Sequence, residues 1–167
     1  MTRETYIRMT AATRQTLARL PGGTRLLRLP TLVCAGAYLL ALLRLMLARD
    51  IRLIRVLLVP AACFLICTAL RPMIGRQRPY DHFDAEPVGR FVRGKGKSMP
   101  SRHTASAAAI ALAVAYAFSS PVIIALMALL CAVIAALRVL AGQHYPSDVL
   151  AALALSSVIS LIGYVLI

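Results

Sequence analysis

Three short polar segments interrupt the apolar runs of this sequence, and they contain residue types that bind and transfer phosphate groups. They span residues 71–79, 99–104 and 138–148 and hold arginine, histidine, serine and aspartate. The planar guanidinium of arginine binds phosphate through two parallel hydrogen bonds, and histidine serves as a nucleophile or proton carrier at neutral pH. The segments therefore predict a site for a phosphate-type anion, provided that the fold brings them together.

Each of these residues taken alone has a simpler explanation. An arginine in a loop often contacts only lipid headgroups, a single interfacial histidine is more often structural, and the helix dipole favours an aspartate in a first turn. The joint spacing favours the site. Pro146 suits the first turn of a helix, which places Asp148 close to His144, where the carboxylate can hold one ring nitrogen. Ser101 and the backbone N–H groups of the helix start that follows it add neutral donors.

Membrane-spanning helices are the elements that must position these segments. The chain has 167 residues, of which 60% are hydrophobic, whereas roughly 45–50% is usual for a soluble domain. A span needs about 20 mainly apolar residues. The expected fold class is therefore all-α, an integral membrane helical bundle of about five transmembrane helices. The predicted spans are residues 29–48, 51–70, 103–119, 121–141 and 147–167.

The chain is predicted to form a single transmembrane domain over residues 30–167. If its spans alternate in direction, the long loop 71–102 and the short turn 142–145 emerge on the same membrane face. A loop of this length is usually functional or disordered. Loop 71–102 is therefore the expected active-site loop.

The first 29 residues are polar and Arg-rich. Tyr6, Met9, Leu17 and Leu20 can share one face of a helix, which predicts a weakly amphipathic helix on the membrane surface. A solvated tail is the alternative interpretation of residues 1–29.

The charge of the chain indicates anionic partners. The formal net charge is +13, from 19 Lys and Arg against 6 Asp and Glu. Nucleic acid is disfavoured because the basic residues are dispersed between apolar runs and Trp is absent. Cys63 and Cys67 have a helical i,i+4 spacing, but no histidine or carboxylate lies near them in sequence to complete a metal site. We therefore expect no metal, no cofactor and no disulfide, and the sequence does not indicate an oligomeric state.

The three segments resemble the signature of the type 2 phosphatidic acid phosphatase superfamily, which reads K-x6-R-P, P-S-G-H and S-R-x5-H-x3-D. This sequence has R-x6-R-P at residues 71–79, P-S-R-H at residues 100–103 and L-R-x5-H-x3-D at residues 137–148. The resemblance runs from about residue 51 to the C-terminus. Three motifs in this order at expected helix boundaries do not arise readily by chance.

The resemblance implies a role for each matching residue. His144 would be the nucleophile that attacks phosphorus, Asp148 would orient and polarise it, and His103 would protonate the leaving oxygen. The family needs no metal. The phosphate and its transition-state charge would be bound by Arg71, Arg78, Ser101, Arg102 and Arg138.

Three positions depart from the family pattern. Arg71 replaces a lysine, which keeps the charge but changes the donor geometry. Leu137 replaces a serine and so removes one hydroxyl donor, and Arg102 replaces a glycine and adds positive charge. None of these departures removes a group to which the family pattern gives a catalytic role.

The resemblance also implies a substrate class. It indicates metal-independent dephosphorylation of a membrane lipid phosphate or diphosphate through a phosphohistidine, with undecaprenyl or another polyprenyl diphosphate expected first. Phosphatidylglycerophosphate, phosphatidic acid and a polyprenyl-phosphoryl sugar phosphate are alternatives. Vanadate-using haloperoxidases share this pocket, but they are large soluble proteins. A non-enzymatic protein that binds anionic lipids is the alternative of another class; it explains the charge but not the spacing of His103, His144 and Asp148.

The expected location is the plasma (inner) membrane, as a multi-pass protein. The Arg-rich segments favour the cytoplasmic side for the polar face, whereas the commonest arrangement in the family puts catalysis on the outer face. The sequence therefore leaves the side of the active site open.

Overall fold

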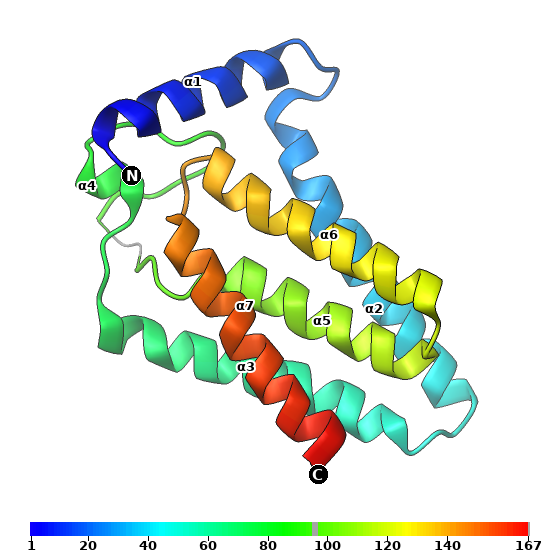
Figure 1. Cartoon of the computed structure of the whole chain (residues 1–167). Coiled ribbons are helices and arrows are strands. Elements are labelled where there is room, and N and C mark those ends of the chain that lie inside the picture. Colours follow the sequence, from blue (N-terminus) through cyan, green and yellow to red (C-terminus); the bar gives the residue numbers. More distant parts are fainter. Residues whose placement is uncertain (95–96, 167) are drawn as a thin grey trace.

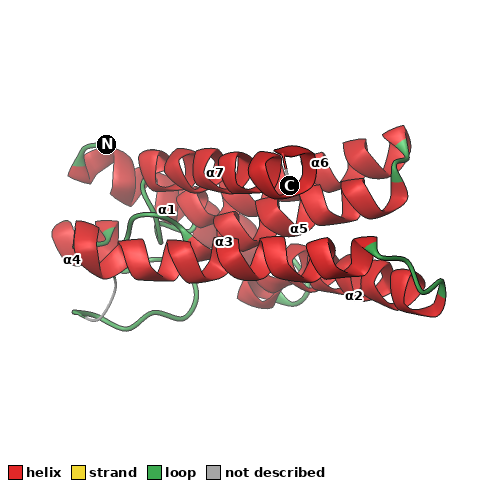
Figure 2. Cartoon of the chain, turned by 90° about the horizontal axis from the view of Figure 1, so that it is seen from below, coloured by secondary structure: helices red, strands yellow, loops and turns green. Residues whose placement is uncertain are grey.

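The computed structural model of the chain describes residues 1–94 and 97–166. Lys95 of the predicted loop and Ile167 at the end of the last predicted span lie outside the described residues. All regular elements of the described part are helices (Figure 2), which confirms the all-α membrane bundle. In chain order they are α1 (Arg3–Ala18), the 3₁₀ helix η1 (Gly23–Arg28), α2 (Leu29–Leu47), α3 (Arg52–Ile74), α4 (Pro79–His82), α5 (Arg102–Phe118), α6 (Pro121–Leu140), α7 (Pro146–Leu161) and the π-helical end η2 (Ile162–Leu166).

Apolar helices form most of the molecule. Within the described residues, four helical segments are long and apolar enough to cross a membrane, namely Gly23–Leu47, Arg52–Ile74, Pro121–Leu140 and Pro146–Val165. Each exposes large apolar side chains, and the exposed fractions of Leu39, Leu58, Leu129 and Leu150 lie between 63% and 65%. Soluble proteins rarely expose apolar surface on this scale. These faces contact lipid, and the chain is a multi-pass membrane protein.

The remaining predicted span, residues 103–119, corresponds to α5, which has 17 residues and lies in the centre of the bundle. It packs against α2, α3, α6 and α7 (Figure 2). Alanines recur every fourth residue along it, and those side chains are at most 1% exposed: Ala105, Ala109, Ala113 and Ala117. Small residues at this spacing let neighbouring helices approach closely, which confirms the interpretation of the stripe as a packing surface.

Helix α3 runs one turn further than predicted, to Ile74 instead of residue 70. Arg71 therefore belongs to the helix, and the loop begins at Gly75. Gly75 has a φ of 64°, the left-handed conformation that ends many helices and that glycine adopts without strain. Its N–H donates to the carbonyl oxygen of Arg71 at 3.1 Å, which closes the last turn.

The long loop after α3, the turn between α6 and α7, and α1 all lie at one end of the bundle, far from the C-terminus (Figure 1). The predicted meeting of loop and turn is therefore found. Helix α1 crosses this end and packs onto both. Tyr6 is fully buried, and its hydroxyl lies 3.2 Å from the carbonyl oxygen of Gly142 and 3.3 Å from that of Ala85. Leu20, predicted on the same apolar face, is 46% exposed.

Gly142 makes the close approach of α1 possible. A Cβ atom at this position would lie 2.6 Å from Cγ2 of Thr10 and 2.6 Å from the hydroxyl oxygen of Tyr6. Its φ of 70° is also one that residues with a side chain rarely adopt. Both the space and the backbone conformation therefore require glycine immediately before the polar residues that lead into α7.

Candidate active site

His144 and Asp148 are both buried at the start of α7, with side chains 2% and 0% exposed. Tyr145 caps the helix, and its backbone N–H donates to Oδ2 of Asp148 at 2.8 Å. Nδ1 of His144 lies 3.6 Å from the same oxygen. The two side chains therefore lie next to each other, as predicted, with Nδ1 on the side of the carboxylate. The separation exceeds a hydrogen bond, and Nδ1 has no other hydrogen-bond partner in the described part of the chain.

Two further residues, neither of them predicted from the sequence, bind Asp148. Nη1 of Arg76 lies 2.9 Å from Oδ1, and the hydroxyl of the fully buried Ser98 donates to Oδ2. Arg76 is also fixed by the ring of Tyr145, whose centroid lies 4.2 Å from its guanidinium carbon. A buried carboxylate needs such partners because desolvation disfavours its charge. No motif marks Arg76 or Ser98, because their contacts depend on the path of the loop.

Burial controls the protonation of His144. Because the ring is removed from water, the pKa of His144 lies below its ordinary value. The Asp148 carboxylate opposes this shift and the positive charge of Arg78 adds to it. The neutral imidazole, which is the form with a free nitrogen lone pair, is therefore favoured near neutral pH.

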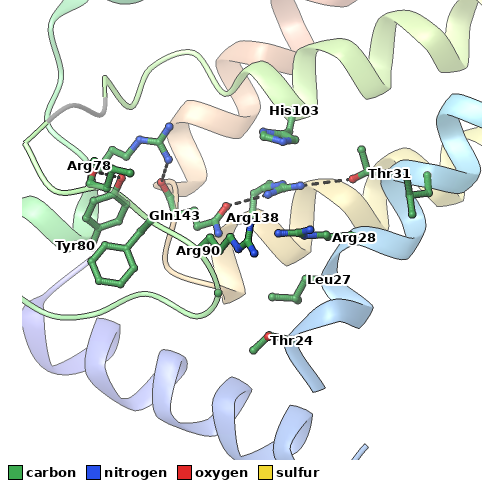
Figure 3. Close-up of a pocket in the computed structure, with 14 residues that line it drawn as sticks. Thr24, Leu27, Arg28, Thr31, Arg78, Tyr80, Arg90, His103, Arg138 and Gln143 are labelled. Carbon is green, nitrogen blue, oxygen red and sulfur yellow. Dashed lines mark hydrogen bonds between the residues drawn. The ribbon is translucent and has the colours of Figure 1, made fainter. Parts of the chain in front are cut away.

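Two of the predicted arginines meet at Gln143, the residue before His144 (Figure 3). Nη1 of Arg138 donates to the side-chain oxygen of Gln143 at 2.9 Å, and Nη1 of Arg78 donates to its backbone oxygen at 3.4 Å. Nη2 of Arg138 also lies 3.5 Å from the hydroxyl of Thr31. These contacts hold both guanidinium groups at one wall of a cavity.

The cavity has a volume of about 890 Å³ and is lined by Arg78, His103 and Arg138 together with residues of η1, α2 and the loop. Its size lies within the range of ordinary ligand sites. Among the described residues that line it, none is acidic. A cavity with several arginines and no carboxylate at its wall is suited to an anion.

The other three predicted phosphate-binding residues lie outside this lining. Arg71 is 6% exposed and donates to the carbonyl oxygens of Pro100, at 2.8 Å, and of Lys97. Ser101 is fully buried; its N–H donates to the backbone oxygen of Asp148 at 3.1 Å, and its hydroxyl lies 3.1 Å from that of Thr104. Arg102 is exposed. Arg71 and Ser101 therefore hold the loop against the starts of α5 and α7.

No group of three His, Cys, Asp or Glu side chains in the described part of the chain could hold a metal ion. The positive charges at the cavity are all arginines. Any anion bound there would meet guanidinium groups.

Comparison with known protein families shows to which family the chain belongs. The sequence profile of the PAP2 superfamily matches residues 52–167. The chain belongs to the PAP2 superfamily. The match includes all three motifs, and it begins at α3, so that α1, η1 and α2 lie outside the matched residues.

Solved structures include a PAP2 protein of the same fold. It is described as the first transmembrane PAP2 type phosphatidylglycerolphosphate phosphatase from Bacillus subtilis, and the two chains superpose with a TM-score of 0.71 at 20% sequence identity. The likeness covers 96% of this chain and 83% of that one. A comparison with curated proteins gave no match. Membership of the PAP2 superfamily confirms the resemblance drawn from the motifs and identifies the chain as a membrane lipid phosphatase.

Proposed function

We propose that the chain removes a phosphate group from a membrane lipid phosphate or diphosphate through a phosphohistidine on His144, without a metal ion. The observation that carries this proposal is the buried pair of His144 and Asp148 beside a cavity lined by arginines. A neutral imidazole whose Nδ1 faces a carboxylate can present Nε2 as the nucleophile. Guanidinium groups at the same place stabilise the charge of the phosphoryl group during transfer.

The reaction proceeds in two displacements. Nε2 of His144 forms a bond to phosphorus while the bond from phosphorus to the leaving oxygen breaks, and His103 donates a proton to that oxygen. The leaving oxygen is the lipid oxygen of a monophosphate or the bridging oxygen of a diphosphate. Water then attacks the phosphohistidine, His103 takes up the proton, and the bond between phosphorus and Nε2 breaks. The products of a monophosphate are the dephosphorylated lipid and inorganic phosphate. The products of a diphosphate are the lipid monophosphate and inorganic phosphate.

Access to His144 requires a movement at the cavity wall. The ring is buried in this structure, and the neighbouring Gln143 is held by Arg78 and Arg138. A phosphate that binds these guanidinium groups competes with Gln143 for them. We infer that substrate binding releases Gln143 and so opens the path to the ring.

A polyprenyl diphosphate remains the first substrate that we propose. Phosphatidylglycerophosphate is the second candidate, because the PAP2 protein of similar fold is named for that activity. We place the protein in the plasma membrane. The apolar outer faces of α2, α3, α6 and α7 allow the lipid tail to stay in the bilayer while its phosphate enters the cavity.

The test is phosphate release by the detergent-purified protein from a panel of lipid phosphates and diphosphates in excess chelator. His144→Ala is expected to lower the rate by a factor on the order of 10⁴ or more, as the loss of a nucleophile does elsewhere. His82→Ala is the matched control, because His82 is exposed on α4, packs on Phe83 and does not line the cavity. Release by His144→Ala at a near-normal rate would exclude the phosphohistidine.

The proton donor is tested separately with leaving groups of different basicity. His103→Ala is expected to slow hydrolysis of a lipid monophosphate more than that of a diphosphate, because the diphosphate leaving group needs less protonation. Equal losses for both substrates would contradict the acid role of His103.

A further inference from the structure

The cavity beside His144 has a second wall that does not come from the three motifs. Arg28, the last residue of η1, and Arg90, in the loop after α4, both line the cavity, as do Leu27 and Phe91 (Figure 3). Arg28 lies outside the residues that match the PAP2 superfamily. We refer to Arg28 and Arg90 as the outer arginines and to Arg78 and Arg138 as the inner arginines.

The outer arginines differ from the inner ones in their contacts. Each inner arginine donates to Gln143. Within the described part of the chain, by contrast, the exposed side chains of Arg28 and Arg90 form no hydrogen bond or ion pair with another residue, although both border the cavity. Arginines that serve only the fold usually bind a carboxylate or a backbone carbonyl, as Arg71 does here.

The outer wall is firmly attached to the inner one. The N–H of Val88 donates to the carbonyl oxygen of Ala141 at 2.8 Å, and the side-chain nitrogen of Gln143 lies 3.4 Å from the oxygen of Val88. Gly89 has a φ of 91°, and a Cβ atom there would lie 3.8 Å from both Gln143 and Leu27. The two hydrogen bonds hold the backbone next to Arg90 against Gln143 and the end of α6, and Leu27 of η1 packs in the same apolar cluster as Val88. The two pairs of arginines therefore belong to one site of defined geometry.

Charge balance indicates what this site binds. Four guanidinium groups border one cavity, and no carboxylate lines it among the described residues. A single phosphate dianion at the inner arginines would leave the outer pair uncompensated. A second phosphate group next to the first would neutralise them, and guanidinium groups bind phosphate with two parallel hydrogen bonds.

We propose that Arg28 and Arg90 form a second anion subsite, which holds the second phosphate group of a lipid that carries two. The proposal rests on the proposed function, because it assigns the substrate class of the same site. The second phosphate is either bonded directly to the first, as in a lipid diphosphate, or separated from it by a short linker, as in phosphatidylglycerophosphate. The apolar side chains of Leu27 and Phe91 at the same wall would contact the start of the lipid tail or linker.

The first experiment compares substrates that share a tail. We would measure kcat/KM for farnesyl diphosphate against farnesyl monophosphate, and for phosphatidylglycerophosphate against phosphatidic acid. Arg28→Gln and Arg90→Gln are each expected to lower the preference for the two-phosphate substrate by about tenfold, as the loss of a charge-assisted hydrogen bond does. An effect in the farnesyl pair alone indicates directly bonded phosphates, and one in the diacyl pair alone indicates a linker.

Matched controls come from the same two segments. Arg25→Gln removes another arginine of η1. Arg93→Gln removes another arginine of the loop, one whose side chain pairs with Asp84. Neither Arg25 nor Arg93 lines the cavity. Both controls are expected to keep the preference of the wild-type protein. If Arg28→Gln and Arg90→Gln lower kcat/KM equally for both substrates of each pair, the outer arginines contact headgroups of the surrounding membrane, and the proposal is overturned.

A second experiment measures the subsite without turnover. In the His144→Ala protein, inorganic pyrophosphate is expected to bind at least about tenfold more tightly than orthophosphate. Arg28→Gln and Arg90→Gln should remove that difference. Equal binding of both ions would overturn the subsite even if the wild-type enzyme is active. A wild-type protein that releases no phosphate but prefers pyrophosphate would instead keep the subsite and exclude the proposed function.

Discussion

The two ends of the bundle both contain arginines, but the arginines have different partners. At the end opposite the cavity, Nη1 of Arg44 donates to the carbonyl oxygen of Ala117 at 2.7 Å, near the C-terminus of α5. Arg52 forms an ion pair with Asp50 at 2.7 Å. Both cations are matched by an acceptor of the protein itself, so they complete helix ends and connections.

At the cavity end, the one fully buried carboxylate does not neutralise the arginines that line the cavity. Asp148 pairs with Arg76 and faces His144, while Arg28 and Arg90 have no acceptor in the described part of the chain. The comparison shows how the same residue type serves structure or binding. What distinguishes Arg44 and Arg52 from the outer arginines is that the fold provides an acceptor for the guanidinium group.

The largest difference in activity between the two ends is expected when one carboxylate at each end, Asp148 or Asp50, is replaced by an amide. Asp148→Asn is expected to lower kcat by about 10³-fold, because the ring of His144 loses the group that orients and polarises it. Asp50→Asn changes one ion pair at the far end and should keep most of the activity. Initial rates of phosphate release, with circular dichroism to verify folding, measure both. Similar losses in the two variants would show that the ends do not differ.

Removal of one arginine from each end should give a smaller difference in kcat than the exchange of the carboxylates. Arg138→Ala is expected to lower kcat by about 10²-fold, since it deletes one donor to the transferring phosphoryl group. Arg44→Ala should lower the melting temperature and leave kcat near the wild-type value. Steady-state kinetics and thermal unfolding in the same detergent provide the test; a large loss of kcat in Arg44→Ala would contradict it.

The pH dependence of activity sharpens the comparison at the cavity end. Burial lowers the pKa of His144, so the neutral nucleophile persists below pH ~6.5, the ordinary histidine value. Activity should fall as the pH drops through this lowered pKa. Asp148 raises the pKa of His144, so Asp148→Asn should move the acid limb of kcat/KM to lower pH. The wild-type protein and Asp148→Asn are measured with the same substrate, so that the ionisation of the substrate affects both equally. A shift of the acid limb to higher pH in Asp148→Asn would contradict the assignment of this limb to His144.

The smallest effect is expected from the contact of α1 with the turn before His144. Tyr6→Phe removes the hydroxyl near the oxygen of Gly142 and should lower kcat by roughly fivefold with little change in KM, about the value of one buried hydrogen bond. Tyr38→Phe is the matched control, because the hydroxyl of Tyr38 donates to the oxygen of Val56 at 2.9 Å, between α2 and α3. Equal kcat values for the two variants would show that α1 does not position the site.

Helix boundaries and motif spacing predicted much of this arrangement. Apolar runs indicated the spans, and the positions of Arg78, His103 and Arg138 at helix ends placed them on one face with His144 and Asp148. The contacts of Arg76 and Ser98 with Asp148 could not be predicted, because they depend on how the loop folds back over α7. The contacts of Arg71 with loop carbonyl oxygens could not be predicted for the same reason, and its phosphate contact stays a prediction.

The N-terminal segment shows where amphipathicity alone was insufficient. Its apolar face predicted a helix on the membrane surface, and α1 is found, but Tyr6 and Leu17 are buried against the protein. A hydrophobic face does not reveal whether lipid or protein covers it. In this chain the cover comes from the loop and from the end of α6, where the hydroxyl of Thr13 donates to the oxygen of Leu140 at 3.1 Å.

The glycine under α1 also has a consequence for biosynthesis. Ribosomes make α1 before α6, so its docking surface at Gly142 is completed only after α6 has been synthesised. During translation α1 therefore lacks its contact with Gly142 until α6 and the turn after it have been made. Nascent chains that stop before α6 is finished would hold α1 through the loop but not through Gly142, and a protease directed at residues 1–18 would detect this weaker docking.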